Sequence, residues 1–384
     1  MLRTTLTATF VVLALGTAGC HALLGIDDFQ TVDAPLAIDA PALVDAPTVD
    51  AQLCFGTLTR VCLQAPPTGT VIIAGTLDTS QDPRCIVVQD PQAGFLCVIA
   101  GGTLSIEATS VIGTRPLVLV AAGQITLNNA IDAGSVRGGK LGPAARSMPC
   151  SAAQTGGSAN QAGGGAGGSF GSTGGGGGQG AGGGGGAGGT AGAVVSVTFL
   201  RGGCAGGPGG MGGGQSAGAL GPSGGAIALY AGSQIALTAT GAIYAAGAGG
   251  GAGSEQGTKG GGGGGGSGGL IVLDAPAIQI LGTIAANGGA GGGGGDGGSG
   301  SPGADGSTAQ YMTTAQGGAP QGLNQGGRGG NGATVGNPAQ VGSVPGIGGN
   351  GGGGGGGGGT GILWIKGAVA TGGSGKLSPT PEMH

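Results

Sequence analysis

Seven cysteines are the side chains of this chain best suited to covalent chemistry. Setting aside Cys20 leaves six, and an even number of thiols favours disulfide bonds in an exported chain. No Cys-x-x-Cys occurs and the two histidines, His21 and His384, lie far apart, so no zinc site is predicted. We expect three disulfides and prefer neighbours in the sequence, because the chain should wind locally; other pairings stay open. The preferred pairs are Cys54–Cys62, Cys85–Cys97 and Cys150–Cys204.

Serines within Gly-x-Ser-x-Gly are the second candidates for chemistry. This pattern surrounds Ser169, Ser223 and Ser267. A nucleophile elbow needs a strand before the serine, a helix after it and a histidine base. No histidine lies between residues 22 and 383, so no Ser-His-Asp triad is predicted within the chain. The pattern follows instead from the abundance of glycine.

Three further glycine motifs resemble known sites without completing them. Gly-x-Gly-x-x-Gly recurs, but no helical pattern follows it as a dinucleotide site requires. Residues 372–376 resemble a phosphate-binding loop, yet Leu377 replaces the required Ser or Thr. Residues 291–296 begin like a calcium-binding nonapeptide, yet Gly298 replaces its apolar residue and no second copy follows. We therefore expect no metal and no cofactor, and we interpret Asp296 and Asp305 as solvated.

Carboxylates support the main enzymatic alternative. Asp274 ends an apolar segment, Asp132 holds a comparable position, and Glu107 lies upstream, so two or three could share one face. Clustered carboxylates of this kind cleave polysaccharides in many enzymes. Sugar-binding grooves usually add aromatic platforms, and few aromatic side chains follow Phe199: Tyr230, Tyr244, Tyr311 and Trp364. We favour outward, solvated carboxylates and a core or cap position for Trp364, and expect no enzymatic activity.

The first residues predict export. One arginine precedes an apolar run over residues 6–15, which is too short to span a bilayer and is typical of a signal peptide over 1–19. The segment at 16–20, GTAGC, resembles the lipobox of bacterial lipoproteins, with Thr17 where leucine is preferred. This resemblance implies that Cys20 is acylated; ordinary cleavage after Ala18 is the alternative. His21, in place of an aspartate, is similar to the outer-membrane class of lipoproteins.

Residues 20–52 predict a tether. The triplet Asp-Ala-Pro recurs every six residues, at 33–35, 39–41 and 45–47. Proline keeps its preceding residue out of the helical region, and the aspartates repel one another, so the segment should stay extended. Fully extended, it would reach on the order of 100 Å. A stalk between an anchored Cys20 and the body is therefore predicted.

Composition excludes two broad classes of function. Glycine accounts for 107 of 384 residues, charged residues for 7%, and the formal net charge is −4. Twelve cations spread over the chain provide no phosphate-binding surface, so nucleic acid is not a predicted partner. The longest apolar stretch after Cys20 is interrupted by Asp274 and Pro276, so no membrane-spanning helix is predicted.

An internal repeat is the most informative pattern for the fold. Four apolar islands emerge between the glycines, each with alternating apolar and often β-branched residues that predict short strands. The first three islands each predict three strands, and the fourth is truncated. These segments are 117–120, 124–127 and 131–134; 226–230, 234–237 and 243–247; 270–273, 277–280 and 284–288; and 362–365.

The short turns between these strands predict a solenoid with one buried strand face. Two to four small residues cannot form helical crossovers, so consecutive strands must bend around a corner, and matching strands should stack in parallel. The pattern resembles the parallel β-helix of many bacterial surface proteins. Upstream strands at 70–73, 85–88, 95–99 and 102–108 should add less regular coils and a cap. The predicted fold class is all-β, a parallel β-helix with long insertions.

Three glycine-rich insertions, 135–224, 248–268 and 289–360, leave the coils at the same point. Disorder is one expectation, because glycine loses the most backbone entropy on ordering. The alternative, which we favour, is a layered packing of threefold extended chains like that of polyglycine II. Runs such as 163–168 are also similar in composition to the polymorphic glycine-rich domains of mycobacterial surface proteins, whose partner domain is absent here.

These patterns together predict a domain order and a function. Residues 1–19 form the signal peptide, 20–52 the anchor and tether, 53–134 the cysteine-containing cap, 135–366 the coils with their insertions, and 367–384 a tail. The chain resembles bacterial glycine-rich lipoproteins, which implies a non-catalytic structural, adhesive or display role at the outer membrane or cell surface. Its expected partners are the membrane, through the lipid, and envelope polysaccharide or other cells. A polysaccharide-cleaving enzyme and an ice-binding protein are the alternatives.

Overall fold

A computed structural model describes residues 53–145, 150–213, 217–253, 259–296, 312–320, 325–347, 349–372 and 375–384. The chain divides into two units, Met1–Val49 and Asp50–His384, and all described residues belong to the second. The predicted signal peptide, Cys20, His21 and the tether therefore lie outside the described residues, as do Asp305 and Tyr311.

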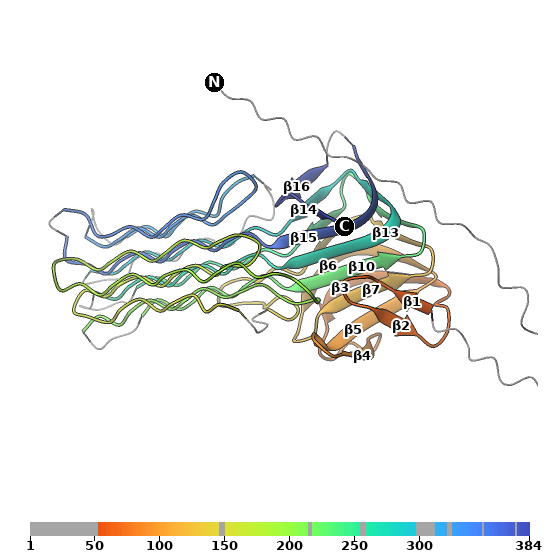
Figure 1. The fold of residues 1–384 in the computed structure, drawn as a ribbon, viewed down its shortest axis with the longest axis horizontal. Coiled ribbons are helices and arrows are strands. Elements are labelled where there is room, and N and C mark those ends of the chain that lie inside the picture. The colour runs from red at the N-terminus through yellow and green to blue at the C-terminus, as the bar shows by residue number, and fades with distance from the viewer. Residues whose placement is uncertain are drawn as a thin grey trace, which may run out of the picture. The chain divides into compact units, whose positions relative to one another are not determined.

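The described part of the chain is all-β and contains no helix, as the sequence predicted. Its strands are β1 (Leu53–Phe55), β2 (Val61–Leu63), β3 (Thr70–Asp78), β4 (Ile86–Asp90), β5 (Gly94–Gly101), β6 (Thr103–Ile112), β7 (Leu117–Ala121), β8 (Gln124–Leu127), β9 (Ala130–Asp132), β10 (Ala226–Ala231), β11 (Gln234–Leu237), β12 (Ala242–Tyr244), β13 (Leu270–Ile280), β14 (Thr283–Ala285), β15 (Ile362–Thr371), β16 (Lys376–Ser378) and β17 (Glu382–Met383). All but β1 and β2 belong to one large, mostly parallel sheet, shown in Figure 1.

Each predicted island contributes matching strands to three parallel ladders. The first ladder runs through β5, β7, β10, β13 and β15, so that Leu119, Leu229 and Leu273 lie in register. The second runs through β6, β8, β11 and the later parts of β13 and β15. The third runs through β6, β9, β12, β14 and β16. Strands from segments more than a hundred residues apart therefore lie side by side.

The fourth island is longer than the sequence analysis expected. β15 continues to Thr371 beside β13, and β16 pairs with β14, so Leu377 stands opposite Ile284. Much of the predicted tail, 367–384, is therefore part of the large sheet. Residues 372–375, which separate β15 from β16 in the sequence, contain no apolar residue and so obscured the repeat.

Two antiparallel pairs interrupt the parallel pattern near the cap. β1 pairs with β2, and β4 pairs with β5. A tight turn explains the second pair, because the Asp90 carboxylate accepts hydrogen bonds from the amides of Gln92 and Ala93 at 2.8 and 2.7 Å. The predicted upstream strand at 85–88 therefore belongs to an antiparallel hairpin, whereas β3, β5 and β6 pair in parallel with other strands, as expected.

The first ladder is buried on both faces, whereas one buried face was expected. Leu117 and Leu119 of β7 belong to one hydrophobic cluster, and Val118 and Val120 to another. In the second cluster, this face of the sheet packs against Val61 and Leu63 of the β1–β2 hairpin and against side chains from the glycine-rich insertions. The continuous apolar run of β7 already indicated this, since strands covered on both faces lack polar alternation.

The glycine-rich insertions leave and re-enter the sheet at adjacent strands. They begin after β9, β12 and β14, which pair with one another in the third ladder. They return into β10, β13 and β15, which pair in the first ladder. Figure 1 shows the insertions running side by side away from one end of these strands. The sheet thus sets both ends of each insertion beside those of its neighbours.

We predict that Ile235→Ala lowers the free energy of unfolding by about 2–5 kcal/mol, because Ile235 is fully buried between two parallel strands and its removal leaves a cavity. The matched control is Ile72→Ala, whose side chain on β3 is 63% exposed and should change stability by about 0.5 kcal/mol or less. Denaturant unfolding measures both. Equal losses for the two variants would contradict the proposed location of the core.

Candidate functional site

The six described cysteines form three disulfides, Cys54–Cys62, Cys85–Cys97 and Cys150–Cys204, which are the preferred pairs of sequence neighbours. The first closes the β1–β2 hairpin, the second joins the segment before β4 to β5, and the third links two parts of the first insertion. Such bonds form in oxidising compartments, which suits an exported chain. Among the described residues, no helix is long and apolar enough to cross a membrane.

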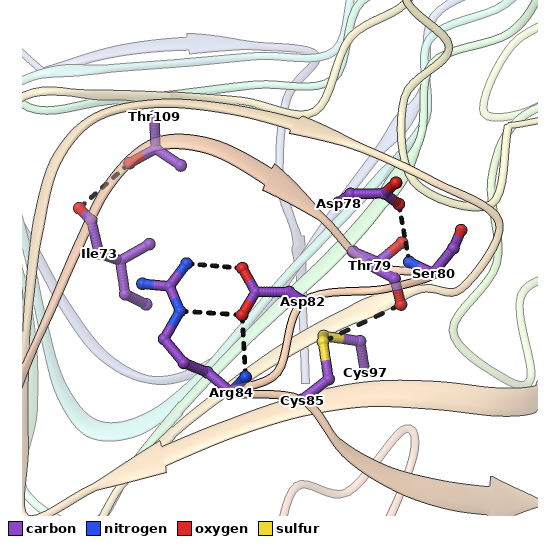
Figure 2. A network of polar contacts seen from close by, with 9 residues as sticks. All are labelled: Ile73, Asp78, Thr79, Ser80, Asp82, Arg84, Cys85, Cys97 and Thr109. Atoms are coloured by element: carbon purple, nitrogen blue, oxygen red, sulfur yellow. Dashed lines mark hydrogen bonds and ion pairs between the residues drawn. A yellow bond between two sulfur atoms is a disulfide. The ribbon is translucent and has the colours of Figure 1, made fainter.

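Polar side chains near the Cys85–Cys97 disulfide form a local network, shown in Figure 2. Arg84 binds both carboxylate oxygens of Asp82, with donor–acceptor distances of 2.9 and 2.7 Å. The Arg84 hydrogen bond lowers the pKa of the Asp82 carboxyl. A catalytic general acid needs a pKa shifted upwards instead. Arg84 and Asp82 therefore act as a clamp in the loop between β3 and β4.

The three carboxylates singled out in the sequence have separate partners. Asp274 accepts a hydrogen bond from the Thr57 hydroxyl at 2.8 Å, and so holds the β1–β2 hairpin against β13. Glu107 accepts a hydrogen bond from the Asn128 side-chain amide at 2.8 Å. Asp132 pairs with the Lys140 ammonium at 2.6 Å. Each carboxylate is engaged in a contact that orders a turn or a hairpin.

Ser110 and Lys140 come closest to a nucleophile–base arrangement among the contacts of these carboxylates. The Lys140 ammonium donates to the Ser110 hydroxyl at 3.2 Å. It also donates to the Asp132 carboxylate at 2.6 Å and to the Asp132 carbonyl at 2.8 Å. An ammonium held by a carboxylate has no lone pair with which to accept the serine proton. The cluster stabilises the start of the first insertion.

The three serines of the Gly-x-Ser-x-Gly pattern are buried and contact backbone. The Ser267 hydroxyl accepts a hydrogen bond from the Cys204 amide and donates to the Gly268 carbonyl, each at 2.9 Å. The Ser169 hydroxyl accepts from the Gly174 amide at 2.9 Å. The Ser223 carbonyl accepts from the Ser135 hydroxyl at 2.6 Å. These contacts join segments of the insertions to one another, through the hydroxyls of Ser169 and Ser267 and the carbonyl of Ser223.

Aromatic and metal-binding groups complete the candidate list. Tyr230 is buried. Its burial, and to a smaller extent the negative charge of the nearby Asp274, raises the pKa of its hydroxyl. Trp364 is buried in the second cluster and stacks on the His384 ring, with centroids 4.7 Å apart. Burial and Asp132 raise the pKa of Tyr244. The described residues contain no group of three His, Cys, Asp or Glu side chains that could hold a metal ion.

The most extensive ordered arrangement is a bundle of glycine-rich segments, at whose centre lie three parallel segments. These are residues 162–168, 259–268 and 353–361, which we call the inner trio. The Gly165 amide donates to the Gly262 carbonyl at 2.9 Å, Gly262 to Gly353 at 3.0 Å, and Gly353 to Ala162 at 2.8 Å. The cycle recurs three residues later, through Gly168, Gly265 and Gly356. A period of three residues therefore links the trio.

Each inner segment also bonds to neighbours outside the trio. Within 162–168, Gly163 donates to Gly157, whereas Gly164 donates to Gly178. Since Gly165 donates to Gly262, three successive amides point to three different segments. The other two inner segments show the same three-way pattern. Such bonding pairs buried backbone groups in several directions, which a flat β-sheet does not do.

The close packing of the bundle depends on the absence of side chains. A Cβ atom added to Gly264 would lie 1.8 Å from the Ala166 carbonyl oxygen, and one added to Gly355 would lie 2.0 Å from that of Gly263. Real Cβ atoms do not approach backbone oxygen so closely. By contrast, a Cβ atom at Gly184 would meet no atom within 4 Å. Glycine is thus required inside the bundle and not at that turn.

A buried arginine joins the bundle to the second hydrophobic cluster. The Arg201 guanidinium carbon lies 5.4 Å from the ring centroid of Phe170, and its Nη2 lies 2.9 Å from the Cys150 sulfur. Burial lowers the pKa of Arg201. Phe170 and Cys204 belong to the cluster that covers the first ladder. Cation–π contact and a disulfide therefore hold together the part of the first insertion that packs against the sheet through this cluster.

The pairing of the inner trio was not predicted from the sequence, although one signal was present. Residues 259–268 and 353–361 lead directly into β13 and β15, and these strands are parallel neighbours. The two glycine runs must therefore approach the sheet in parallel. Residues 162–168 precede no strand, so their place in the trio had no comparable signal.

Comparison of the chain with protein-family models, with curated proteins and with solved structures finds no match.

We predict that Gly264→Ala destabilises the bundle by roughly 1–3 kcal/mol, because the added methyl group would force the inner trio apart. Amide hydrogen exchange should become faster across 162–168, 259–268 and 353–361, while exchange in β7 and β8 stays slow. The matched control, Gly184→Ala, adds the same methyl group where there is space. Identical exchange in both variants would show that the bundle does not depend on this packing.

Proposed function

We propose that this chain is an exported cell-surface lipoprotein that is not catalytic and that displays a rigid glycine-rich bundle for a structural or adhesive role. The observation that carries the proposal is the inner trio, in which backbone hydrogen bonds recur every three residues and side chains are nearly absent. The longest insertions of the chain build this projection. It exposes a backbone surface to partners and carries few of the side chains that catalysis requires.

The body of the protein is proposed to be a parallel β-helix. The three ladders support this, since the first two islands give one strand to each ladder in the same order. In the third and fourth islands, β13 and β15 run through the first and second ladders before β14 and β16 enter the third. Short turns join these strands, so the chain has to change direction between ladders. Stacked coils would also account for the cluster that contains Leu119, Ile125 and Ile131, one residue from each consecutive strand.

The bundle is proposed to adopt packing like that of polyglycine II. In that arrangement, threefold extended chains hydrogen-bond to several neighbours, which explains successive amides that point in different directions. The antiparallel return segments support the same interpretation, because Gly164 and Gly167 bond to Gly178 and Gly175 with the same period. A bundle of this kind would be stiff, since every inner segment is held on several sides.

A lipid anchor at Cys20 would hold the glycine-rich bundle at the outer membrane. The lipobox-like segment and the tether would place the body at a distance from the outer membrane, and the disulfides support an oxidising surroundings. The resemblance to bacterial glycine-rich lipoproteins supports the same location. Envelope polysaccharide or other cells are the proposed partners at that surface.

Acylation of Cys20 is directly testable. We predict that producing cells incorporate a palmitate analogue into the wild-type chain, and that Cys20→Ala abolishes the incorporation, because the thiol is the proposed acylation site. A Cys54→Ala and Cys62→Ala double variant serves as the control, since it removes two other thiols and should keep the label. Label that persists in Cys20→Ala would remove the anchor from the proposal.

Adhesion tests the display role. We predict that cells carrying a Gly264→Ala and Gly355→Ala double variant lose most of their attachment to surfaces or to one another, because both changes disrupt the inner trio. Cells carrying Gly183→Ala and Gly184→Ala are the matched control and should attach like the wild type. Surface labelling must show equal amounts of the two variants.

Two outcomes would overturn the proposed function. Attachment that is unaffected by the inner-trio variant would show that the ordered bundle has no adhesive role. Release of reducing ends from a polysaccharide panel by the purified chain, abolished by Asp274→Ala, would favour the enzymatic alternative. Thr57→Ala controls that experiment, because it removes the same hydrogen bond while keeping the carboxylate.

A further inference from the structure

One outer segment of the bundle presents apolar side chains at every third residue. Val341, Val344 and Ile347, which we call the outer ridge, are 69%, 59% and 110% exposed. Gly342, which lies between Val341 and Val344 in the sequence, is buried. The spacing of the ridge equals the three-residue period that links the inner trio. Val341 and Val344 therefore lie on one face of an extended segment, and Ile347 lies in the turn that ends it.

The other faces of the same segment are already occupied. The amides of Gln340 and Ser343 donate to the carbonyls of Asn331 and Arg328, at 2.9 and 2.8 Å. The Gly342 amide donates to the Gly176 carbonyl at 2.8 Å. The carbonyls of Gln340 and Ser343 accept from the inner trio, through Gly357 and Gly354. Two faces of the segment thus continue the packing of the bundle, and the third faces outward.

The outward face retains unused backbone groups. Within the part of the chain that the structure describes, the amides and carbonyls of Val341 and Val344 make no hydrogen bond. Shallow cavities flank the ridge on both sides. One of about 480 Å³ lies against residues 179–182, and one of about 380 Å³ lies against Gly326, Arg328 and Gly329. An extended chain could enter these cavities and pair with the free groups.

We propose that the outer ridge binds the outer ridge of a second copy of this chain. A partner for this face must be extended, must offer backbone donors and acceptors every three residues, and must tolerate contact with valine and isoleucine. The chain's own segment at 338–345, with Ile347 in the turn that follows it, meets all three requirements. Isologous contact would let each ridge enter a cavity beside the other and would bury the apolar side chains of both.

Charge is compatible with this partner. Between residues 325 and 361, Arg328 is the only charged residue. Two such faces therefore meet with little like-charge repulsion, and little charge has to be desolvated. The inference goes beyond the proposed function, and it does not depend on the lipid anchor. In an adhesive protein, such contact would join copies on the same cell or on neighbouring cells.

Sedimentation equilibrium tests the inference, with the chain carrying Cys20→Ala so that no acyl group can associate. The wild-type ridge should give a reversible dimer, and the triple variant Val341→Ser, Val344→Ser and Ile347→Ser should weaken dimerisation by at least about tenfold. The matched control is Ile72→Ser, Val194→Ser and Met211→Ser, which removes three exposed apolar side chains elsewhere and should dimerise like the wild type. Amide exchange of the inner trio must be unchanged in both variants.

A charge exchange makes the test specific to ridge-to-ridge contact. Val344→Asp alone and Val344→Lys alone should both be monomeric, and an equal mixture of the two should recover dimers, because opposite charges then meet across the contact. A wild-type chain that remains monomeric at its highest soluble concentration overturns the inference. So does a triple variant that dimerises normally, a control variant that loses dimerisation equally, or a mixture that stays monomeric. Binding of a monomeric wild type to phosphatidylcholine vesicles, lost in the triple variant, would assign the ridge to lipid instead.

Discussion

The backbone hydrogen bond between segments without side chains is the interaction on which this structure depends. In the inner trio, amide and carbonyl groups bond in a repeating cycle such as Gly165 to Gly262 to Gly353. These bonds require the segments to approach so closely that a Cβ atom would overlap a carbonyl oxygen at Gly264 or Gly355. The bundle therefore requires glycine at these positions. Ordering glycine is nevertheless costly, because glycine loses more backbone entropy than any other residue.

The large sheet supplies what the glycine segments lack. Parallel strands lie roughly 4.8 Å apart, and the insertions begin and end at neighbouring strands, so their first residues are already at hydrogen-bonding distance. Ala245, for example, lies just beyond β12 and donates to Ala285, the last residue of β14, and Gly247, Gly250 and Gly253 continue the pattern. The apolar core of the sheet thus stabilises the bundle indirectly, because it fixes the alignment from which the period-three bonds extend. The Cys150–Cys204 disulfide and the buried Arg201 hold together the part of the first insertion that packs against the sheet.

Groups that elsewhere perform chemistry serve here to hold loops against this framework. Asp132 binds Lys140 at the start of the first insertion, Asp82 binds Arg84 before β4, and Asp274 binds Thr57 of the hairpin. Ser267 connects the Cys204 and Gly268 backbones inside the bundle. A chain with so few charged residues uses them where the polypeptide turns, since an uncapped turn would otherwise leave backbone groups without partners.

Sequence alone determined the islands, their order and the all-β class, because alternating apolar residues report strands through local geometry. It also determined that Leu119, Leu229 and Leu273 should correspond, since a repeat preserves register. Only the tertiary structure decided that β7 is covered on both faces, that β15 and β16 complete a fourth unit, and which glycine runs become neighbours. The physical reason is that identical glycines carry no side-chain pattern. Gly262 could bond equally well to many carbonyls, and the pairing of β13 with β15, which follow these two glycine runs, selects Gly353.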